Sequence, residues 1–290
     1  MSRRHLGLLL LLSAIWGASF MLIKVGVRDL DPATLVLFRV VLAAATLLPI
    51  AAALGVLRGM RRWWKQLTVM GLLNSALPFW LLSFGETRID SGLTAVIQAA
   101  APIFTALLAV RIDPSQRVTG IRLVGIFVGF VGVAMLVGGQ RGGELVGALA
   151  IVVTAACYAA GVLYGGRKLS HLQPTQIALG TMLSACVLIA PLGLAQLPGT
   201  SVGWKPLLSV VALGVVGTGL AYILYFEIVR GAGASRAILV TYLVPALALG
   251  YGAVFLDERV TAGAVGGLAL VLGGVALATG VVRRPASVPT

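Results

Sequence analysis

The sequence predicts an all-α integral membrane protein with ten transmembrane helices, arranged as two inverted repeats of five helices. Three observations support this fold class. Of the 290 residues, 59% are hydrophobic and 11% are charged, whereas soluble domains carry about 25% charged residues. The apolar residues form separate runs of membrane-spanning length. In addition, one segment recurs with similar sequence in the second half of the chain.

A membrane-spanning helix needs about 20 mostly apolar residues, and each apolar run of about this length is counted as one span. The expected spans are 6–27, 33–55, 66–85, 91–110, 119–138, 145–165, 174–197, 206–229, 234–256 and 262–282. The runs are continuous and do not alternate, which favours helices over barrel strands. The first run resembles a signal peptide, but it continues through Ile23 and favours an uncleaved first span.

The basic residues orient these spans. If the N-terminus lies in the cytoplasm, 15 of the 22 Lys and Arg residues fall at cytoplasmic ends, 6 fall at the opposite ends, and Arg39 lies within a span. This asymmetry predicts that both termini are cytoplasmic. The net charge of +13 is scattered between apolar runs. It therefore indicates contact with anionic lipid rather than binding of nucleic acid.

A repeat relates the two halves of the chain. Residues 117–136 read "RVTGIRLVGIFVGFVGVAML" and residues 259–278 read "RVTAGAVGGLALVLGGVALA". The same shift pairs Trp16 with Tyr158, and a slip of one residue pairs Pro102 with Pro245. Because five is an odd number, two five-span copies must face opposite ways across the membrane. Inverted repeats around a midplane site are a transporter architecture, and the predicted repeats are 6–138 and 145–282.

Three segments carry a resemblance to a known family. They are "AIWGASFMLIKVG" (14–26), "LFRVVLAA" (37–44) and "GAGASRAILVTYLVPALALGYGAVFLDERVT" (231–261). On the basis of these segments, the chain resembles the EamA family of the drug/metabolite transporter superfamily over nearly its whole length. The family shows an acidic signature after its fourth and ninth spans. Here the second copy is "LDERVT", whereas the first, "VRIDPSQRVT", places Gln116 opposite Glu258.

The resemblance implies a bacterial inner-membrane transporter whose cavity, lined by spans 1, 3, 4, 6, 8 and 9, opens to one side at a time. Polar and aromatic residues in these spans fall at helical spacing. The candidate substrate-binding residues are Trp16, Phe20, Asn74, Pro78, Gln98, Pro102, Tyr158, Tyr222, Tyr225, Tyr242 and Pro245. The two prolines of spans 4 and 9 suggest matched kinks, which serve either as gating hinges or as static packing devices.

Other residues have simpler interpretations. Ser and Thr in these spans can bond to their own backbone, and Trp63, Trp64 and Trp204 fit interfacial anchors. Lys24 either reaches an outer vestibule or snorkels to the interface. Glu227 is expected to pair with Arg230, and Asp257 and Glu258 to form a solvated cap on an external loop.

The charge placement predicts a neutral, amphipathic and aromatic cavity, which argues against phosphate substrates. The expected function is export of small amphipathic metabolites, above all amino acids, including aromatic ones and methionine. A broader drug or toxic-compound exporter is the alternative, whereas a membrane-embedded enzyme or a scaffold is disfavoured. The expected partners are a small-molecule substrate and the lipid bilayer, without metal or other cofactor, and a monomer could suffice. The direction and coupling of transport, and the roles of Lys24, Arg39 and Glu227, stay open.

Overall fold

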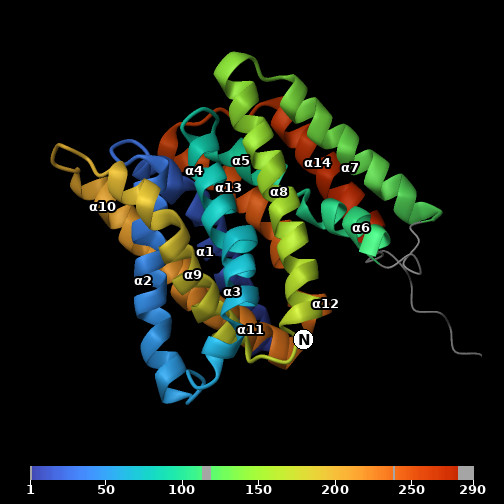
Figure 1. Cartoon of the computed structure of the whole chain (residues 1–290). Helices are drawn as coiled ribbons and strands as arrows, with labels where there is room; N and C mark the ends of the chain where they lie inside the picture. Colours follow the sequence, from blue (N-terminus) through green and yellow to red (C-terminus); the bar gives the residue numbers. More distant parts are fainter. Residues whose placement is uncertain (1, 113–118, 238, 280–290) are drawn as a thin grey trace, which may run out of the picture.

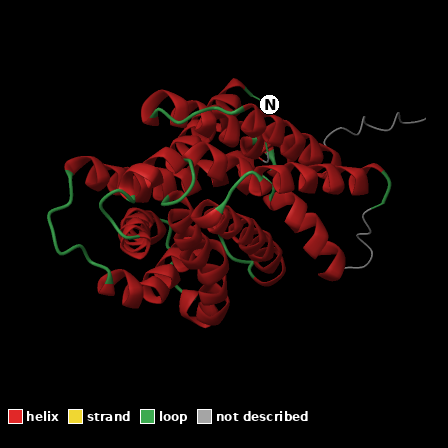
Figure 2. Cartoon of the chain, turned by 90° about the horizontal axis from the view of Figure 1, so that it is seen from above, coloured by secondary structure: helices red, strands yellow, loops and turns green. Residues whose placement is uncertain are grey.

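The protein is a bundle of helices (Figure 1). The computed structural model describes residues 2–112, 119–237 and 239–279, and these ranges contain no strand (Figure 2). Within them, nine helical stretches are long and apolar enough to cross a membrane, and a further apolar helix, Val240–Leu256, has 17 residues. The predicted all-α, multi-pass membrane fold is therefore confirmed.

The first half of the chain contributes five stretches. They are α1 (Arg3–Gly26), α2 (Pro32–Ala53), a composite of η1 (Met60–Trp63), α3 (Trp64–Gly71), η2 (Leu72–Ala76) and α4 (Leu77–Glu86), a broken pair of α5 (Ser91–Gln98) and α6 (Ala101–Ile112), and α7 (Ile121–Gly138). The prediction ended the third span at residue 85, one residue before the helix ends.

The second half repeats this order. It contains α8 (Gly142–Lys168), α9 (Pro174–Ala195), a composite of α10 (Trp204–Val211), η3 (Ala212–Leu220) and α11 (Ala221–Ala232), the short α12 (Ala234–Ala237) with α13 (Val240–Leu256), and α14 (Ala262–Thr279). The predicted first copy of the acidic signature, including Gln116, lies outside the described residues.

The bundle has two ends, which we name from α1. The N-terminal face is the end at which α1 begins, and the distal face is the end at which α1 finishes (Figure 1). The α4–α5 connection lies at the distal face, because Lys24 near the end of α1 bonds to Glu86 and Ile89 there. The α13–α14 connection lies at the same face, since Glu258 bonds to Ser91.

Close packing of small residues holds α7 and α14 side by side at one edge of the bundle (Figure 1). A Cβ added to Gly125 would meet the backbone nitrogen of Ala278 at 2.5 Å, and one added to Gly274 would meet the nitrogen of Gly129 at 2.5 Å. Such backbone approach is typical of membrane helices, where packing rather than hydrophobic burial drives association. At the other side α2 packs along α9.

Two π-helical segments interrupt equivalent spans of the two halves. The segment η2 occupies Leu72–Ala76 in the third span, and η3 occupies Ala212–Leu220 in the eighth. A π-turn changes the backbone pairing and appears often at functional sites. Asn74 lies in η2 and Thr218 in η3, so both segments carry residues of the site described below.

The two predicted proline kinks differ from each other. The fourth span is broken at Ala99 and Ala100, directly before Pro102 at the second position of α6. In contrast, α13 is helical from Val240 to Leu256 and passes through Pro245. Within the described residues, a break next to the matched proline is thus found in the fourth span and not in the ninth.

Candidate functional site

Aromatic and amide side chains from four spans meet in the interior of the bundle. The rings of Trp16 on α1 and Tyr225 on α11 have centroids 5.7 Å apart. On the same helix Tyr222 stacks on Phe226 with centroids 6.0 Å apart. The amide of Asn74 donates to the Tyr222 hydroxyl at 3.4 Å, which links the third span to the eighth.

The sixth span, α8, lies against this group of aromatic and amide side chains. A Cβ added to Gly161 on α8 would lie 3.2 Å from the Asn74 amide oxygen. Tyr158 lies one turn earlier on α8. We name Trp16, Asn74, Tyr158, Tyr222 and Tyr225 the central cluster. All five are half-buried, and all five are sequence-predicted site residues that the structure brings together.

A cation reaches the central cluster from α2. Arg39 is 6% exposed; its Nε donates to the Thr218 hydroxyl at 3.0 Å, and its guanidinium carbon lies 3.8 Å from the centre of the Phe79 ring. Thr218 precedes Tyr222 by four residues in the eighth span, so the guanidinium lies beside the central cluster. The expectation of a neutral centre is therefore wrong. Arg39 lies two turns after the start of α2. Its long side chain extends inward, so that its charge lies at the middle of the third and eighth spans.

The remaining predicted site residues lie in varied surroundings. Phe20, Pro78 and Pro245 are buried, whereas Pro102 is half-buried. Gln98 ends α5, and its amide oxygen is buried without a hydrogen-bond partner among the described residues. Tyr242 shares a hydrogen bond of 3.3 Å with Thr279 on α14, so its hydroxyl faces the last span.

Several hydroxyl groups follow the simpler interpretation. The side chains of Ser13, Thr94, Thr105 and Thr154 each donate to the carbonyl four residues earlier in the same helix or its N-cap. These bonds satisfy the hydroxyl within the helix. The groups therefore need no partner on another span.

Polar contacts join helix ends at the distal face. Lys24 donates from Nζ to the carbonyl oxygens of Glu86 and Ile89, each at 2.8 Å. The Glu258 carboxylate accepts the Ser91 N–H at 2.8 Å, the Ser91 hydroxyl at 2.9 Å and the Gly92 N–H at 3.1 Å. Glu258 thus caps the start of α5, where the helix dipole favours negative charge. The prediction of a solvated external cap was wrong for Glu258, whereas Asp257 is exposed.

Sequence reasoning missed Glu86, a buried acid at the end of α4. Its side chain is 0% exposed, and both carboxyl oxygens lack a hydrogen-bond partner in the part of the chain that is described. Lys24, Glu258 and Arg39 interact with it electrostatically. The predicted span stopped at residue 85, so Glu86 was read as a loop residue. Only its position directly after an apolar run could have signalled it.

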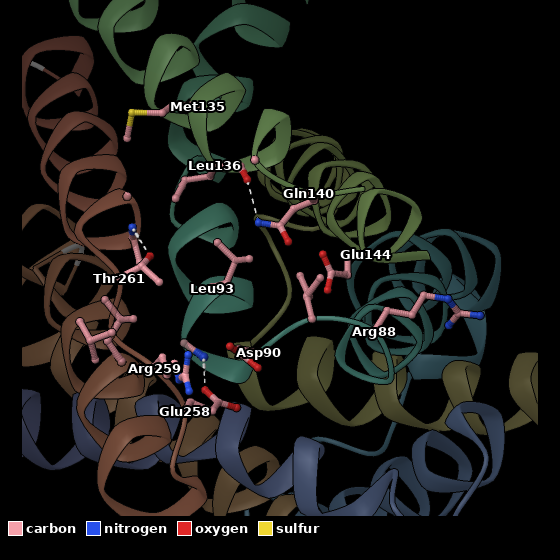
Figure 3. A pocket seen from close by; sticks show the side chains of 17 residues that line it. Arg88, Asp90, Leu93, Met135, Leu136, Gln140, Glu144, Glu258, Arg259 and Thr261 are labelled. Carbon is pink, nitrogen blue, oxygen red and sulfur yellow. Dashed lines mark hydrogen bonds between the residues drawn. The ribbon is translucent and has the colours of Figure 1, made fainter. Parts of the chain in front are cut away.

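A pocket of about 370 Å³ opens at the distal face, between α5, α7, α8 and α14. Figure 3 shows Arg88, Asp90, Glu144 and Glu258 around it. Burial raises the pKa of the Asp90 carboxyl, and the negative charge of Glu258 raises it further. Members of the central cluster are absent from the lining of this pocket, which places it apart from the predicted site.

At the N-terminal face, Glu227 accepts from Arg230 at 2.9 Å and from Arg4 at 3.1 Å. The predicted local pair with Arg230 is confirmed, and the contact with Arg4 ties α11 to the start of α1. Surface ion pairs of this kind contribute little to stability. Glu227 is therefore a structural contact between two spans.

Comparison with known proteins places this arrangement in a family. The profile of the EamA-like transporter family matches residues 4–138 and, a second time, residues 145–280. The chain belongs to the EamA-like transporter family. Members of this family are transporters, and this chain is accordingly a multi-pass membrane transporter and not an enzyme.

Curated relatives of this EamA-like protein match over nearly their full lengths. A probable terminal-alkyne amino-acid exporter of Streptantibioticus cattleyicolor is 29% identical, with 93% of this chain and 91% of the relative covered. A probable amino-acid metabolite efflux pump of Escherichia coli K12 is 27% identical, with 90% of each covered. A solved crystal structure with 18% identity superposes with a TM-score of 0.68, covering 98% of this chain and 100% of its own, and supports the fold.

Proposed function

We propose that this EamA-like transporter exports small amphipathic metabolites, with amino acids, including aromatic ones and methionine, as the principal class. The observation that carries the proposal is the central cluster, where aromatic rings, an amide and a guanidinium from both halves of the chain converge. Aromatic walls with a few placed polar groups suit an amphipathic ligand. Two relatives are named for amino-acid export or efflux, which supports this class.

Transport is proposed to proceed by alternating access between two inverted repeats, 6–138 and 145–282. The packing supports this symmetry. The first span, α1, packs against α13 and against the composite of α10, η3 and α11, and its counterpart α8 packs against α6 and against the composite that includes α4. These partners of α1 thus have equivalents among the partners of α8. The two π-segments repeat in the same manner.

We propose that this conformation is closed between the central cluster and the distal face, since members of the cluster are absent from the lining of the distal pocket. There α5 packs against α1, α8 and α13, and Lys24 and Glu258 bridge the helix ends. If the termini are cytoplasmic in the inner membrane, as the charge asymmetry predicts, the distal face is external. Substrate would then enter the central cluster from the cytoplasm and leave when these distal contacts open.

The test is transport by purified protein in liposomes. Labelled amino acids and hydrophobic cations are offered separately, with and without an imposed pH gradient. The proposal expects exchange of aromatic amino acids and methionine. Movement of hydrophobic cations alone would support the broader drug-efflux function instead. Rates that do not respond to the gradient would exclude proton coupling.

A further inference from the structure

The guanidinium of Arg39 has donor capacity that the protein does not use. Its Nε is occupied by Thr218, and its flat face lies on Phe79. The terminal nitrogen NH1 is buried and has no hydrogen-bond partner within the described residues. A buried unpaired donor is costly, and a buried cation in a membrane usually has a partner. This nitrogen therefore lacks the acceptor that its position demands.

Donor groups of the central cluster lie in the same region as this nitrogen. Thr218, which Arg39 contacts, precedes Tyr222 by four residues in the eighth span, and Tyr158 is another phenol of the central cluster. Tyr222 accepts from Asn74, so its own proton has no described acceptor, and the Tyr158 hydroxyl has no hydrogen bond to any described residue. A phenol donates one hydrogen bond, and a guanidinium only donates. Each of these three donors thus lacks an acceptor among the described residues.

No acid among the described residues forms an ion pair with the Arg39 guanidinium. Glu86 interacts with Arg39 electrostatically, yet the ion pairs found among the described residues both involve Glu227 at the N-terminal face. An excess of donors around a desolvated cation fits an anionic acceptor with two oxygens, because a guanidinium and a carboxylate form charge-assisted bonds of matching geometry.

We propose that NH1 of Arg39, together with the hydroxyls of Tyr158 and Tyr222, binds the carboxylate of the transported molecule. This inference rests on the proposed function and names the group on the substrate that is recognised. Trp16 and Tyr225 then flank the apolar part of the substrate, since they lie further along the same cluster. NH1 has no contact with solvent in this conformation, so binding requires side chains around it to move.

The recognition is tested with a matched set of substrates in the same liposomes. Phenylalanine carries a carboxylate, phenylalaninamide carries a neutral amide at the same position, and phenethylamine carries neither. Wild-type protein is expected to prefer phenylalanine by about tenfold or more, the value of a hydrogen bond to a charged group. Arg39→Gln is expected to slow phenylalanine and leave phenylalaninamide nearly unchanged, so that the preference disappears.

Three further variants distinguish a loss of recognition from misfolding of Arg39→Gln. Tyr158→Phe removes one hydroxyl and keeps the ring, and it is expected to lower the phenylalanine preference several-fold. Tyr164→Phe is the matched control on the same helix, because Tyr164 lies outside the central cluster, and it is expected to keep the full preference. Restoration of part of the preference by Arg39→Lys would support a role of the charge.

The outcomes separate the two proposals. Wild-type protein that moves phenylalanine and phenylalaninamide equally overturns the carboxylate site and leaves amino-acid transport standing. Equal loss of both substrates in folded Arg39→Gln and Tyr158→Phe variants also overturns it, since that result indicates a structural role. Wild-type protein that moves none of these substrates overturns the proposed function itself, and the carboxylate site with it.

Discussion

The carboxylate of Glu258 lies 2.8 Å from the backbone nitrogen of Ser91 and 2.9 Å from its hydroxyl. The two residues are 167 positions apart, one directly after the ninth span and the other at the start of the fourth. The contact therefore joins the two halves of the chain at the distal face. It also satisfies two of the N–H groups that the start of a helix leaves without partners.

Replacing this acid gives the first prediction. Glu258→Ala removes an N-terminal cap from α5 and is expected to lower the free energy of unfolding by about 1–2 kcal/mol. Thermal unfolding in detergent measures the change. Asp257→Asn is the control, because Asp257 is exposed and has a φ of 57°, a conformation that Asn tolerates. Equal stability of Glu258→Ala and wild type would show that the cap contributes nothing.

Asp90 gives a pH-dependent prediction. Burial and the charge of Glu258 raise its pKa, so the folded protein binds this proton more tightly than the unfolded chain does. Stability is then lost as the pH rises from about 4, the ordinary range of Asp, through the raised value. Asp90→Asn is expected to raise the melting temperature at pH 7 and to leave it unchanged below about pH 4. A gain of the same size at both pH values would contradict this assignment.

Glu86 tests what a buried carboxyl contributes when the protein offers it no donor. Glu86→Gln keeps the shape and cannot ionise, so we expect folding stability at neutral pH to be maintained or increased. Glu86→Lys places a cation beside Lys24 and Arg39, the cations that interact with this site. It is expected to cost several kcal/mol. Yield and melting temperature in detergent measure both. A clear loss of stability in Glu86→Gln would show that the carboxylate has a required partner.

The packing of α7 on α14 gives a prediction about small residues. A Cβ at Gly125 would meet three atoms of α14 at 2.5–2.7 Å, whereas one at Gly138, at the end of the same helix, would meet no atom within 4 Å. Gly125→Ala must push the helices apart, at a cost of about 1–3 kcal/mol. Gly138→Ala is expected to be neutral or slightly stabilising, because alanine favours the helix. Similar melting temperatures for both variants would contradict the close approach.

The sequence predicts the spans well because each depends on a local property, the length of an apolar run. Trp16 and Tyr158 were found because they lie well inside their spans and not at the ends, where aromatic anchors are usual. Tyr222 was found because it falls at helical spacing in its span. Residues whose role depends on a distant partner were not. Glu258 was misread because Ser91 is remote in sequence. Arg39 was placed within a span with its role left open, because the sequence does not show where its side chain points. The π-segments carry no sequence signal that distinguishes them from the α-helix around them.

The central cluster gives the last prediction, which concerns transport itself. Trp16→Ala removes the ring that contacts Tyr225 and is expected to reduce the transport rate about tenfold, equivalent to about 1.4 kcal/mol. Gln98→Ala is expected to impair transport as well, because its buried amide oxygen has no hydrogen-bond partner among the described residues and can accept a bond from a ligand. Trp204→Ala is the matched control: this ring is 70% exposed at the start of α10 and fits an interfacial anchor. Initial rates in liposomes, corrected for the amount of folded protein, compare the three. If Trp204→Ala reduces transport as much as the other two, aromatic anchoring in the membrane rather than substrate contact explains the effect, and the central cluster is not the binding site.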